Sequence, residues 1–144
     1  MKRVLIFYIY TALLFACTVK PEPIRYGTDM CHACKMTLMD RKYGGEVVTR
    51  KGKIYKFDDI NCMVNFLNSG YLEDREISHR LVTDYAQPGT LIDATQAFYL
   101  KSEEIRSPMA GHLAAFRSEE MMETHKKQLN AIYLTWGEVV TQFK

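Results

Sequence analysis

One stretch of the sequence constrains the fold more than any other: a hairpin pattern that leads directly into an amphipathic helix. Residues 45–49 and 53–57 are rich in β-branched and aromatic side chains, and the turn between them contains Gly52. This pattern predicts two antiparallel strands. Apolar side chains then recur at helical spacing from Ile60 to Leu67, and a helix of this kind buries its apolar stripe against a neighbouring sheet. We therefore expect an α+β fold.

Capping residues mark both ends of this helix. Asp58 or Asp59 has the short carboxylate side chain preferred at an N-cap, and Gly70 has the conformational freedom that ends a helix. Further along, residues 80–85 alternate between apolar and polar side chains and stop before Pro88-Gly89. The alternation predicts one more half-buried strand, ended by a turn.

The second half of the chain follows a similar plan. Strands are predicted at residues 91–100 and 112–116, and Ser118 is placed to cap a helix that begins after it. We expect two small ββα-type halves, residues 25–75 and 76–144, with helices packed on antiparallel sheets and a short tail at the end. Short strand-to-helix junctions can also look alike by chance, and the period is too long for a simple repeat array.

The N-terminus has the pattern of a secretory signal. Lys2 and Arg3 precede an unbroken apolar run, residues 4–16. The run is short for a membrane span, because a spanning helix needs roughly 20 apolar residues, and its length suits the apolar part of a signal peptide. We expect a signal peptide at residues 1–16, with an uncleaved anchor helix as the alternative.

The cysteine that follows this run predicts a lipid anchor. Residues 14–17, Leu-Phe-Ala-Cys, resemble a bacterial lipobox, in which the cysteine receives the lipid and becomes the mature N-terminus. Acyl chains on Cys17 would hold the protein on a membrane surface without a spanning helix. Residues 17–24 contain two prolines and are expected to form a stiff tether between the anchor and the folded part.

Length and charge narrow the class of protein further. The chain has 144 residues, which favours one domain or two very small ones. It carries 19 basic and 17 acidic residues, and removing residues 1–16 removes Lys2 and Arg3, which leaves 17 of each. A neutral exported domain lacks the basic surface that nucleic-acid binding requires, so we expect no nucleic-acid partner.

The cysteine count calls for an explanation in an oxidising compartment. With Cys17 assigned to the lipid, Cys31, Cys34 and Cys62 remain, and an odd number cannot all pair within the chain. An unpaired cysteine outside the cytoplasm is usually oxidised, masked by burial or used. Metal ligation is one such use.

Soft ligands are concentrated between Met30 and Met36. This short segment contains two thiols, one imidazole and two thioethers. Thiolate and thioether ligands select copper(I), whereas structural zinc sites make little use of methionine. Cys34 and Met36 are two positions apart, so an extended backbone would direct both side chains to the same side. Cys31 and Cys34 can meet only across a turn.

Each of these residues also has a simpler interpretation. Cys31 and Cys34 could form a structural disulfide or a thioredoxin-like redox pair, although no βαβ unit is visible around them. His32 is expected to be a solvated loop residue, and Cys62 a small buried residue on its helix with a second metal role in reserve. Gap-filling in the core is the interpretation favoured for the remaining methionines, namely Met30, Met39, Met63, Met121 and Met122.

A loop in the second half offers one more sulfur ligand. Met109 follows Pro108 and precedes Ala110-Gly111, so packing does not account for it. Loops often carry binding groups, and Met109 is therefore a candidate to complete the site from the second half, with His112 as a weaker candidate.

Several separated motifs occur in order along the chain. They are Tyr26-Gly27, Cys31-x-x-Cys34-x-Met36, Tyr43-Gly44-Gly45, Phe57-Asp58-Asp59-Ile60-x-Cys62-Met63, Asp84-Tyr85, Asp93-Ala94 and the segment 109–116. Together they resemble the NosL family, whose members are copper-binding lipoproteins that accompany nitrous oxide reductase. The resemblance extends from about Arg25 to Gln128. By this resemblance, Cys34 and Met36 match the Cys-x-Met metal motif of the family, and Met109 matches a methionine in its later loop.

The resemblance implies a function as well as a fold. We expect an exported copper(I) carrier that supplies the copper–sulfur centre of nitrous oxide reductase, works with copper transport components and catalyses no reaction. It would be lipid-anchored in the bacterial cell envelope and face the periplasm, with Cys34, Met36, Met109 and Cys31 around the ion. The alternative is a membrane-anchored thiol-disulfide oxidoreductase that uses Cys31 and Cys34.

Overall fold

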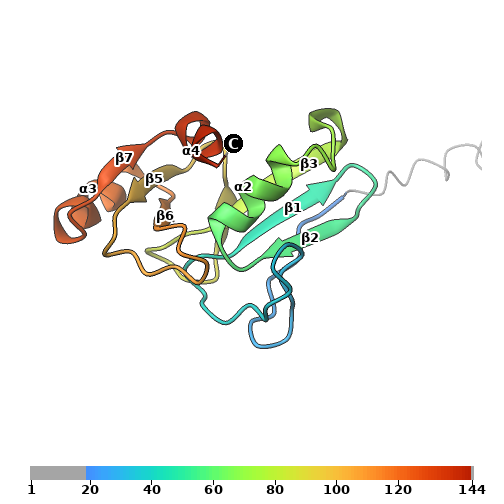
Figure 1. The fold of residues 1–144 in the computed structure, drawn as a ribbon, viewed down its shortest axis with the longest axis horizontal. Helices are drawn as coiled ribbons and strands as arrows, with labels where there is room; N and C mark the ends of the chain where they lie inside the picture. Colours follow the sequence, from blue (N-terminus) through green and yellow to red (C-terminus); the bar gives the residue numbers. More distant parts are fainter. Residues whose placement is uncertain (1–18, 144) are drawn as a thin grey trace, which may run out of the picture.

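The predicted hairpin and helix form the first part of the structure. The computed structural model describes residues 19–143, so the predicted signal peptide 1–16 and the predicted lipid site Cys17 lie outside the described residues. In chain order the elements are β1 (Gly45–Thr49), β2 (Ile54–Phe57), α2 (Ile60–Asn68), the short 3₁₀ helix η1 (Asp74–Glu76), β3 (Ile77–Thr83), β4 (Leu91–Asp93), β5 (Phe98–Lys101), β6 (Leu113–Phe116), α3 (Glu119–Gln128), β7 (Ile132–Leu134) and α4 (Trp136–Gln142). Figure 1 shows these elements as two neighbouring sheets with helices packed on them. The expected α+β class is confirmed.

All strand pairs in both sheets are antiparallel. The first sheet has the order β2-β1-β3-β4, and the second has the order β6-β5-β7. Gly45 lies opposite Phe57 on one side and Val82 on the other, which makes β1 a central strand. All five residues of β1 are buried, because a central strand under a helix has little contact with water.

The helices begin at the expected caps. The Asp59 side chain accepts a hydrogen bond from the backbone N–H of Asn61 at the start of α2, and Ser118 accepts one from Met121 at the start of α3. Gly70 follows the C-cap of α2 with a φ of +71°, a conformation that glycine adopts without strain. Helix α2 packs on the first sheet, and α3 and α4 both pack on β5 of the second.

Two parts of the expected topology are wrong. The strand expected over residues 91–100 divides into β4, in the first sheet, and β5, in the second. The Asp93 side chain accepts a hydrogen bond from the Thr95 N–H at 2.8 Å, and this turn ends β4. The expected short tail is also ordered, as β7 and α4. Thr135 and Glu138 form a capping box at the start of α4.

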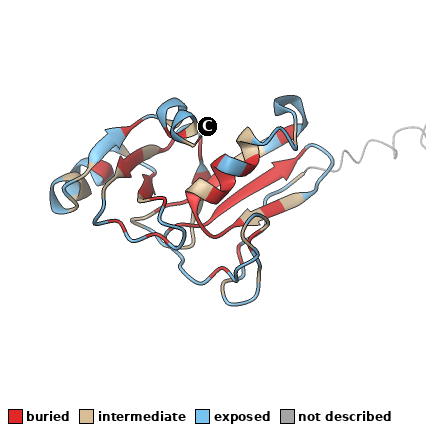
Figure 2. Cartoon of the chain, in the orientation of Figure 1, coloured by how far each residue is buried: buried red, intermediate tan, exposed pale blue. Residues whose placement is uncertain are grey.

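The core crosses from one sheet to the other. Tyr99 and Leu113 of the second sheet belong to the same buried cluster as Val47 and Phe57 of the first. The end of β3 is also joined to β6, because Tyr85 N–H donates to the Ala115 carbonyl at 2.8 Å. Figure 2 shows buried residues continuing from the β1 and α2 region into β5 and β6. The division into halves at residue 75 stays a prediction.

Part of the predicted tether is packed on the domain. The backbone N–H of Glu22 donates to the Glu46 carboxylate at 3.1 Å, and Lys56 Nζ donates to the Pro23 carbonyl at 3.2 Å. Ile24 is buried. Residues 22–24 therefore lie against the first sheet. Within residues 19–143, no helix is both long enough and apolar enough to cross a membrane.

Candidate metal centre

The segment that carries the first two cysteines folds back on itself as an irregular hairpin, residues 26–38. Cys31 N–H donates to the Met36 carbonyl at 2.8 Å, and Met30 pairs with Thr37 in an isolated antiparallel bridge. The backbone carbonyl of Cys31 also accepts a hydrogen bond from the Lys35 N–H at 3.0 Å. These bonds close a tight turn that brings Cys31 and Cys34 together.

Contacts with β2 fix the position of this hairpin. His32 N–H donates to the Lys56 carbonyl at 2.7 Å on the outer edge of β2. Lys56 Nζ contacts the Asp29 carboxylate at 2.7 Å, and both side chains are largely buried. Burial alone would raise the pKa of Asp29, but hydrogen bonds from Lys56 and from the backbone and side chain of Arg25 outweigh it and lower that pKa. The ion pair therefore stays formed at neutral pH.

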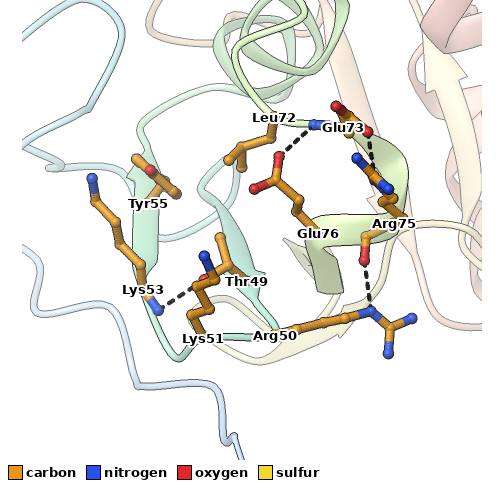
Figure 3. Close-up of a pocket in the computed structure, with 9 residues that line it drawn as sticks. All are labelled: Thr49, Arg50, Lys51, Lys53, Tyr55, Leu72, Glu73, Arg75 and Glu76. Atoms are coloured by element: carbon orange, nitrogen blue, oxygen red, sulfur yellow. Dashed lines mark hydrogen bonds and ion pairs between the residues drawn. The ribbon is translucent and has the colours of Figure 1, made fainter.

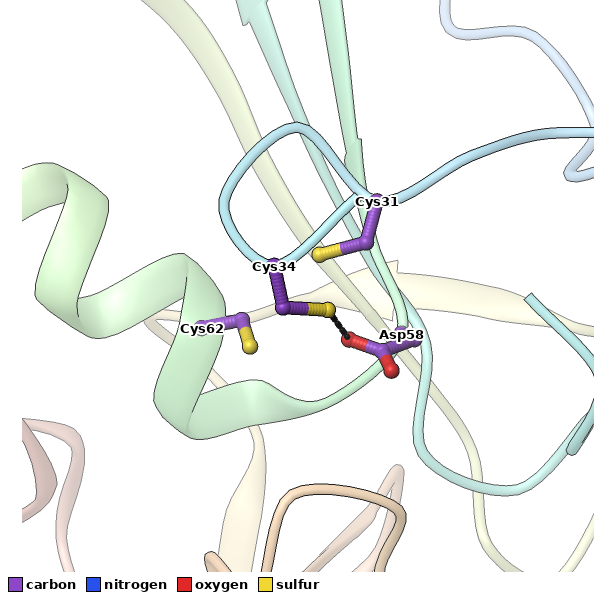
Figure 4. Close-up of side chains that lie close together, drawn as sticks. All are labelled: Cys31, Cys34, Asp58 and Cys62. Atoms are coloured by element: carbon purple, nitrogen blue, oxygen red, sulfur yellow. Dashed lines mark hydrogen bonds between the residues drawn. The ribbon is translucent and has the colours of Figure 1, made fainter. Parts of the chain in front are cut away.

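The cysteines of the hairpin meet two further groups at the junction of β2 and α2. Asp58 follows the last residue of β2, and Cys62 lies in the first turn of α2. One ligand atom from each of Cys31, Cys34, Asp58 and Cys62 lies within 4.8 Å of all the others. The Cys34 thiol donates to the Asp58 carboxylate at 3.4 Å. Figure 4 shows that the four side chains come from the hairpin, the strand end and the helix.

We call these four residues the Cys3Asp cluster. Cys31, Asp58 and Cys62 are buried, and Cys34 is partly exposed. No cysteine among residues 19–143 forms a disulfide. Cys34 is therefore the member of the cluster that the solvent reaches.

The thiols influence one another's protonation. Interaction with the Cys62 thiol lowers the pKa of Cys31 against the opposing effect of burial. The interaction with Cys31, together with burial, raises the pKa of Cys62, and burial raises the pKa of Cys34. One thiolate is thus stabilised at the expense of the other two. A bound cation would remove this conflict, because it favours deprotonation of every thiol that ligates it.

The spacing of the cluster suits a single metal ion. In a tetrahedral site with metal–sulfur bonds of about 2.3 Å, neighbouring sulfur atoms lie about 3.8 Å apart. The four atoms within 4.8 Å of one another need only a small contraction to reach that geometry. Three thiolates suit a soft or borderline ion, and the carboxylate oxygen adds a harder fourth donor.

The extended backbone expected between Cys34 and Met36 is wrong. Lys35 lies in the left-handed region with a φ of +65°, because the chain reverses there to close the turn. An extended backbone therefore does not direct the side chains of Cys34 and Met36 to the same side. Met36 follows the turn and is 53% exposed. Its role as a ligand stays a prediction.

The loop that carries Met109 is held against the same helix end. The carboxylate of Asp59 accepts hydrogen bonds from Met109 N–H at 2.9 Å and from Gly111 N–H at 3.4 Å. Asn61 Nδ2 also donates to the Met109 carbonyl at 3.0 Å. Asp59 adjoins Asp58 of the cluster, and Asn61 adjoins Cys62. The second half of the chain thus holds the Met109 backbone against the start of α2, the helix that carries Cys62. The role of Met109 as a ligand stays a prediction.

The remaining candidate residues have other contacts. His32 lies in a turn, as expected, but its ring is half-buried and packs edge-on against Tyr55, with 4.7 Å between ring centroids. The His112 ring contacts the Ile105 carbonyl at 3.0 Å. Met63 and Met122 are buried in the core as expected. The same interpretation is wrong for three other methionines, because Met30, Met39 and Met121 are exposed.

Two members of the cluster carry a sequence signal that the spacing argument did not use. The sequence patterns predict a capping role for Asp58 and a packing role for Cys62. Both lie at a strand-to-helix junction, a few residues apart, where the chain brings side chains of the strand end and the first helical turn together. Only the contact between β2 and the 26–38 hairpin shows that Cys31 and Cys34 meet them there.

Comparisons with known proteins agree on one family. The NosL family model matches residues 25–142. A solved structure described as the copper chaperone NosL from Shewanella denitrificans has a TM-score of 0.71 and 19% sequence identity, and the match covers 83% of this chain and 95% of that one. At this identity the likeness shows a shared fold. No curated protein matches the sequence.

Proposed function

The chain belongs to the NosL family, and on that premise we propose that it is a copper chaperone that holds copper(I) at the Cys3Asp cluster. The observation that carries the proposal is the convergence of three thiols and one carboxylate within 4.8 Å. Copper(I) favours sulfur ligands and low coordination numbers. Cys31, Cys34 and Cys62 would supply the thiolates.

Exposed thioethers would serve the entry and release of the ion. Met36 and Met109 are both exposed, and the Met109 loop is fixed next to the cluster through Asp59. A thioether binds copper(I) without a proton to lose, so it can replace a thiolate while a partner's ligands take over. We propose that Met36 and Met109 form the exposed entrance of the site. Cys34 would be the thiolate that binds the ion both at this entrance and in the buried cluster.

The destination of the copper follows from the family. We propose that the chain is an exported lipoprotein, anchored through Cys17 in the bacterial cell envelope and facing the periplasm. It would receive copper from transport components and deliver it for assembly of the copper–sulfur centre of nitrous oxide reductase. In this role it carries an ion and catalyses no reaction.

An oxidoreductase function has less support from the geometry. A redox pair needs a nucleophilic thiolate that a substrate disulfide can reach. The thiol with the lowered pKa, Cys31, is only 1% exposed. The accessible thiol, Cys34, has a raised pKa. The thiol that is more readily deprotonated and the thiol that a substrate can reach are therefore different residues.

Copper(I) titration of the reduced protein against a chromogenic chelator tests the proposal. We expect the Cys34→Ala variant to lose affinity by more than the roughly 10–100-fold typical of residues that only support a metal site. Cys62→Ala should also weaken binding, because its sulfur belongs to the cluster. Met36→Leu should weaken binding modestly, and the matched variant Met121→Leu, on α3, should leave it unchanged.

Unaltered binding in a Cys34→Ala, Met36→Ala double variant would contradict the proposal. X-ray absorption at the copper edge gives an independent count of the sulfur neighbours. Three short copper–sulfur distances that fall to two in Cys62→Ala would support the thiolate set.

A further inference from the structure

We propose that the end of the domain formed by the β1–β2 turn and η1 faces the membrane and binds anionic phospholipid head groups. We call this surface the basic end and define it by Arg50, Lys51, Lys53 and Arg75. The inference rests on the proposed lipid anchor at Cys17. It goes further, because an anchor alone leaves the orientation of the domain open.

The anchor is short once the packed residues are taken into account. Glu22 is hydrogen-bonded to Glu46, and Pro23 to Lys56, so both are fixed on the first sheet. Glu22 is five positions after Cys17, and a fully extended chain spans at most about 3.4 Å per residue. The bilayer surface would therefore lie within about 17 Å of this part of the sheet. Glu46 and Lys56 lie toward the Asp58 end of β1 and β2, so the short tether keeps the first sheet near the lipid but does not by itself select which end faces it.

The path of the chain selects the end that faces the lipid. Figure 1 shows the described chain starting, in blue, at the end of the first sheet where β1 turns into β2. The same end carries η1, because Arg50 Nε in the turn donates to the Arg75 carbonyl at 2.8 Å. The Cys3Asp cluster lies at the opposite end of β2. Lys53 and Asp58 flank the four residues of β2, and five steps of extended chain place them roughly 17 Å apart.

The charge of this end suits an anionic surface. Arg50, Lys51 and Lys53 are all exposed and lie within four residues of one turn. Arg75 faces them across a hollow of about 530 Å³, shown in Figure 3, with Tyr55 and Leu72 in its lining. The hollow thus offers cationic groups at its rim and apolar surface inside. A phospholipid head group has the matching combination of a phosphate and an apolar glycerol region.

Three acidic residues, Glu73, Asp74 and Glu76, lie at the same end. Glu73 pairs with Arg75 Nε at 2.6 Å, Asp74 pairs with Arg80, and Glu76 accepts a hydrogen bond from the Glu73 N–H at 2.9 Å. Among the described residues, the turn residues Arg50, Lys51 and Lys53 have no carboxylate partner and therefore carry the free positive charge of this end. Lys51 has no hydrogen bond or ion pair among the contacts of residues 19–143. Lys20, which is exposed and close in sequence to Cys17, adds a further positive charge near the anchor. Each basic residue near an anionic membrane strengthens association about five-fold.

Such an orientation would direct the metal site away from the lipid. The Cys3Asp cluster and the Met109 loop would face the aqueous compartment, where a soluble partner can reach Cys34. The membrane-facing surface and the copper-transfer surface would then be separate.

Paramagnetic broadening from labelled lipids tests the orientation. The full-length, processed protein would be placed in nanodiscs of phosphatidylcholine, with or without phosphatidylglycerol, that contain a trace of gadolinium-chelating lipid. We expect the strongest loss of amide signal at residues 50–53 and 73–76 when phosphatidylglycerol is present. High salt should reduce this loss, because it screens exposed charges.

A charge-matched pair of variants supplies the control. Lys51→Glu, Lys53→Glu should bring the broadening at the turn down to the level seen with phosphatidylcholine alone. Lys126→Glu, Lys127→Glu changes the net charge equally on α3 and should leave the pattern as in the wild type.

Three outcomes would overturn the inference. Broadening centred on α3 or on the cluster would show another orientation, and broadening independent of anionic lipid would exclude head-group recognition. Unbroadened residues 50–53 alongside binding to an acidic protein would reassign the basic end to a protein partner. Failure of the protein to associate with the nanodiscs would remove the anchor itself, whereas copper(I) titration would still test the chaperone function separately.

Discussion

At the scale of single residues, Asp58 is the member of the cluster whose donor atom would respond differently to different ions. Its carboxylate lies 3.4 Å from Cys34 Sγ, already within the spacing of two ligands on one ion. A carboxylate oxygen is a good ligand for zinc(II) and similar divalent ions and a poor one for copper(I). The three thiolates suit both. The same pocket should therefore use three donors for copper(I) and four for a divalent ion.

Replacing Asp58 separates these two modes. We expect Asp58→Asn to leave copper(I) affinity nearly unchanged and to weaken cobalt(II) or zinc(II) binding by at least about ten-fold, because only the divalent ions use the oxygen. Competition titrations give both affinities, and the intense visible bands of tetrahedral cobalt(II) report the geometry. Equal weakening for copper(I) and cobalt(II) would show that Asp58 supports the fold of the site and does not ligate.

Glu46 makes a second residue-scale prediction, concerning pH. Burial raises the pKa of this carboxyl, and its Oε2 atom has no hydrogen-bond partner within the described residues. A raised pKa means that the folded state binds the proton more tightly than the unfolded state. Its stabilising contribution is present below the unfolded pKa and is lost as the pH rises through the folded pKa.

The Glu46→Gln variant removes this titration. Relative to the wild type, the variant should therefore be more stable at about pH 8 than at about pH 4, so the difference in unfolding free energy (variant minus wild type) should be more positive at pH 8. Urea denaturation at the two pH values measures the difference. Glu104→Gln, at an exposed position, should show no such change. A constant difference for Glu46→Gln at both pH values would contradict the assignment.

At the scale of elements, Asp59 joins the two parts of the candidate site. One carboxylate oxygen caps α2, and the other accepts the N–H groups of the Met109 loop. The fit is close, because a β-carbon at Gly111 would lie 2.6 Å from Asp59 Oδ1. A helix cap thus also positions a loop from the other sheet.

The double role of Asp59 should be visible in stability. Asp59→Ala loses a cap, worth about 1–2 kcal/mol, and the hydrogen bonds to the loop, worth about 1 kcal/mol each. We expect a loss of roughly 3 kcal/mol by denaturant unfolding. Ser118→Ala removes a cap with no loop attached and should cost about 1 kcal/mol. Similar losses in both variants would mean that the loop bonds contribute little.

The sequence predicts those elements whose conformation is set by interactions within the same short segment. The hairpin around Gly52 and the helix capped by Asp59 follow from turn and capping chemistry, and both are confirmed. The capping box at Thr135 was also present in the sequence, and α4 could have been found from it. The split of residues 91–100 has a local signal in the Asp93–Thr95 turn, but the sheet that β4 and β5 each join depends on tertiary contacts. The cluster was predicted in part, since Cys31 and Cys34 are neighbours but Cys62 reaches them through tertiary contacts.

At the scale of the whole molecule, a shared core ties the sheets together. Leu134 of β7 and Val139 of α4 belong to the same buried cluster as Val47 of β1. Helix α2 contacts both β6 and α4 in addition to its own sheet. A second buried cluster, on the second sheet, is built from Tyr43, Leu100, Ile105, Ala114, Phe116 and Met122. The shared cluster is therefore the one that joins the two sheets.

This arrangement predicts that residues 19–143 unfold as one cooperative unit. Leu134→Ala should cost about 2–5 kcal/mol, the range for truncating a buried leucine. The cost should appear equally in the hydrogen exchange of Val47 in the first sheet and Tyr99 in the second, because both belong to the same buried cluster as Leu134. Ile132→Ala changes the same strand at a position that is 60% exposed and should have little effect. Faster exchange at Tyr99 alone, or separate unfolding transitions by Trp136 fluorescence and far-ultraviolet circular dichroism, would show that the halves fold independently and that the Met109 loop can leave the cluster without unfolding it.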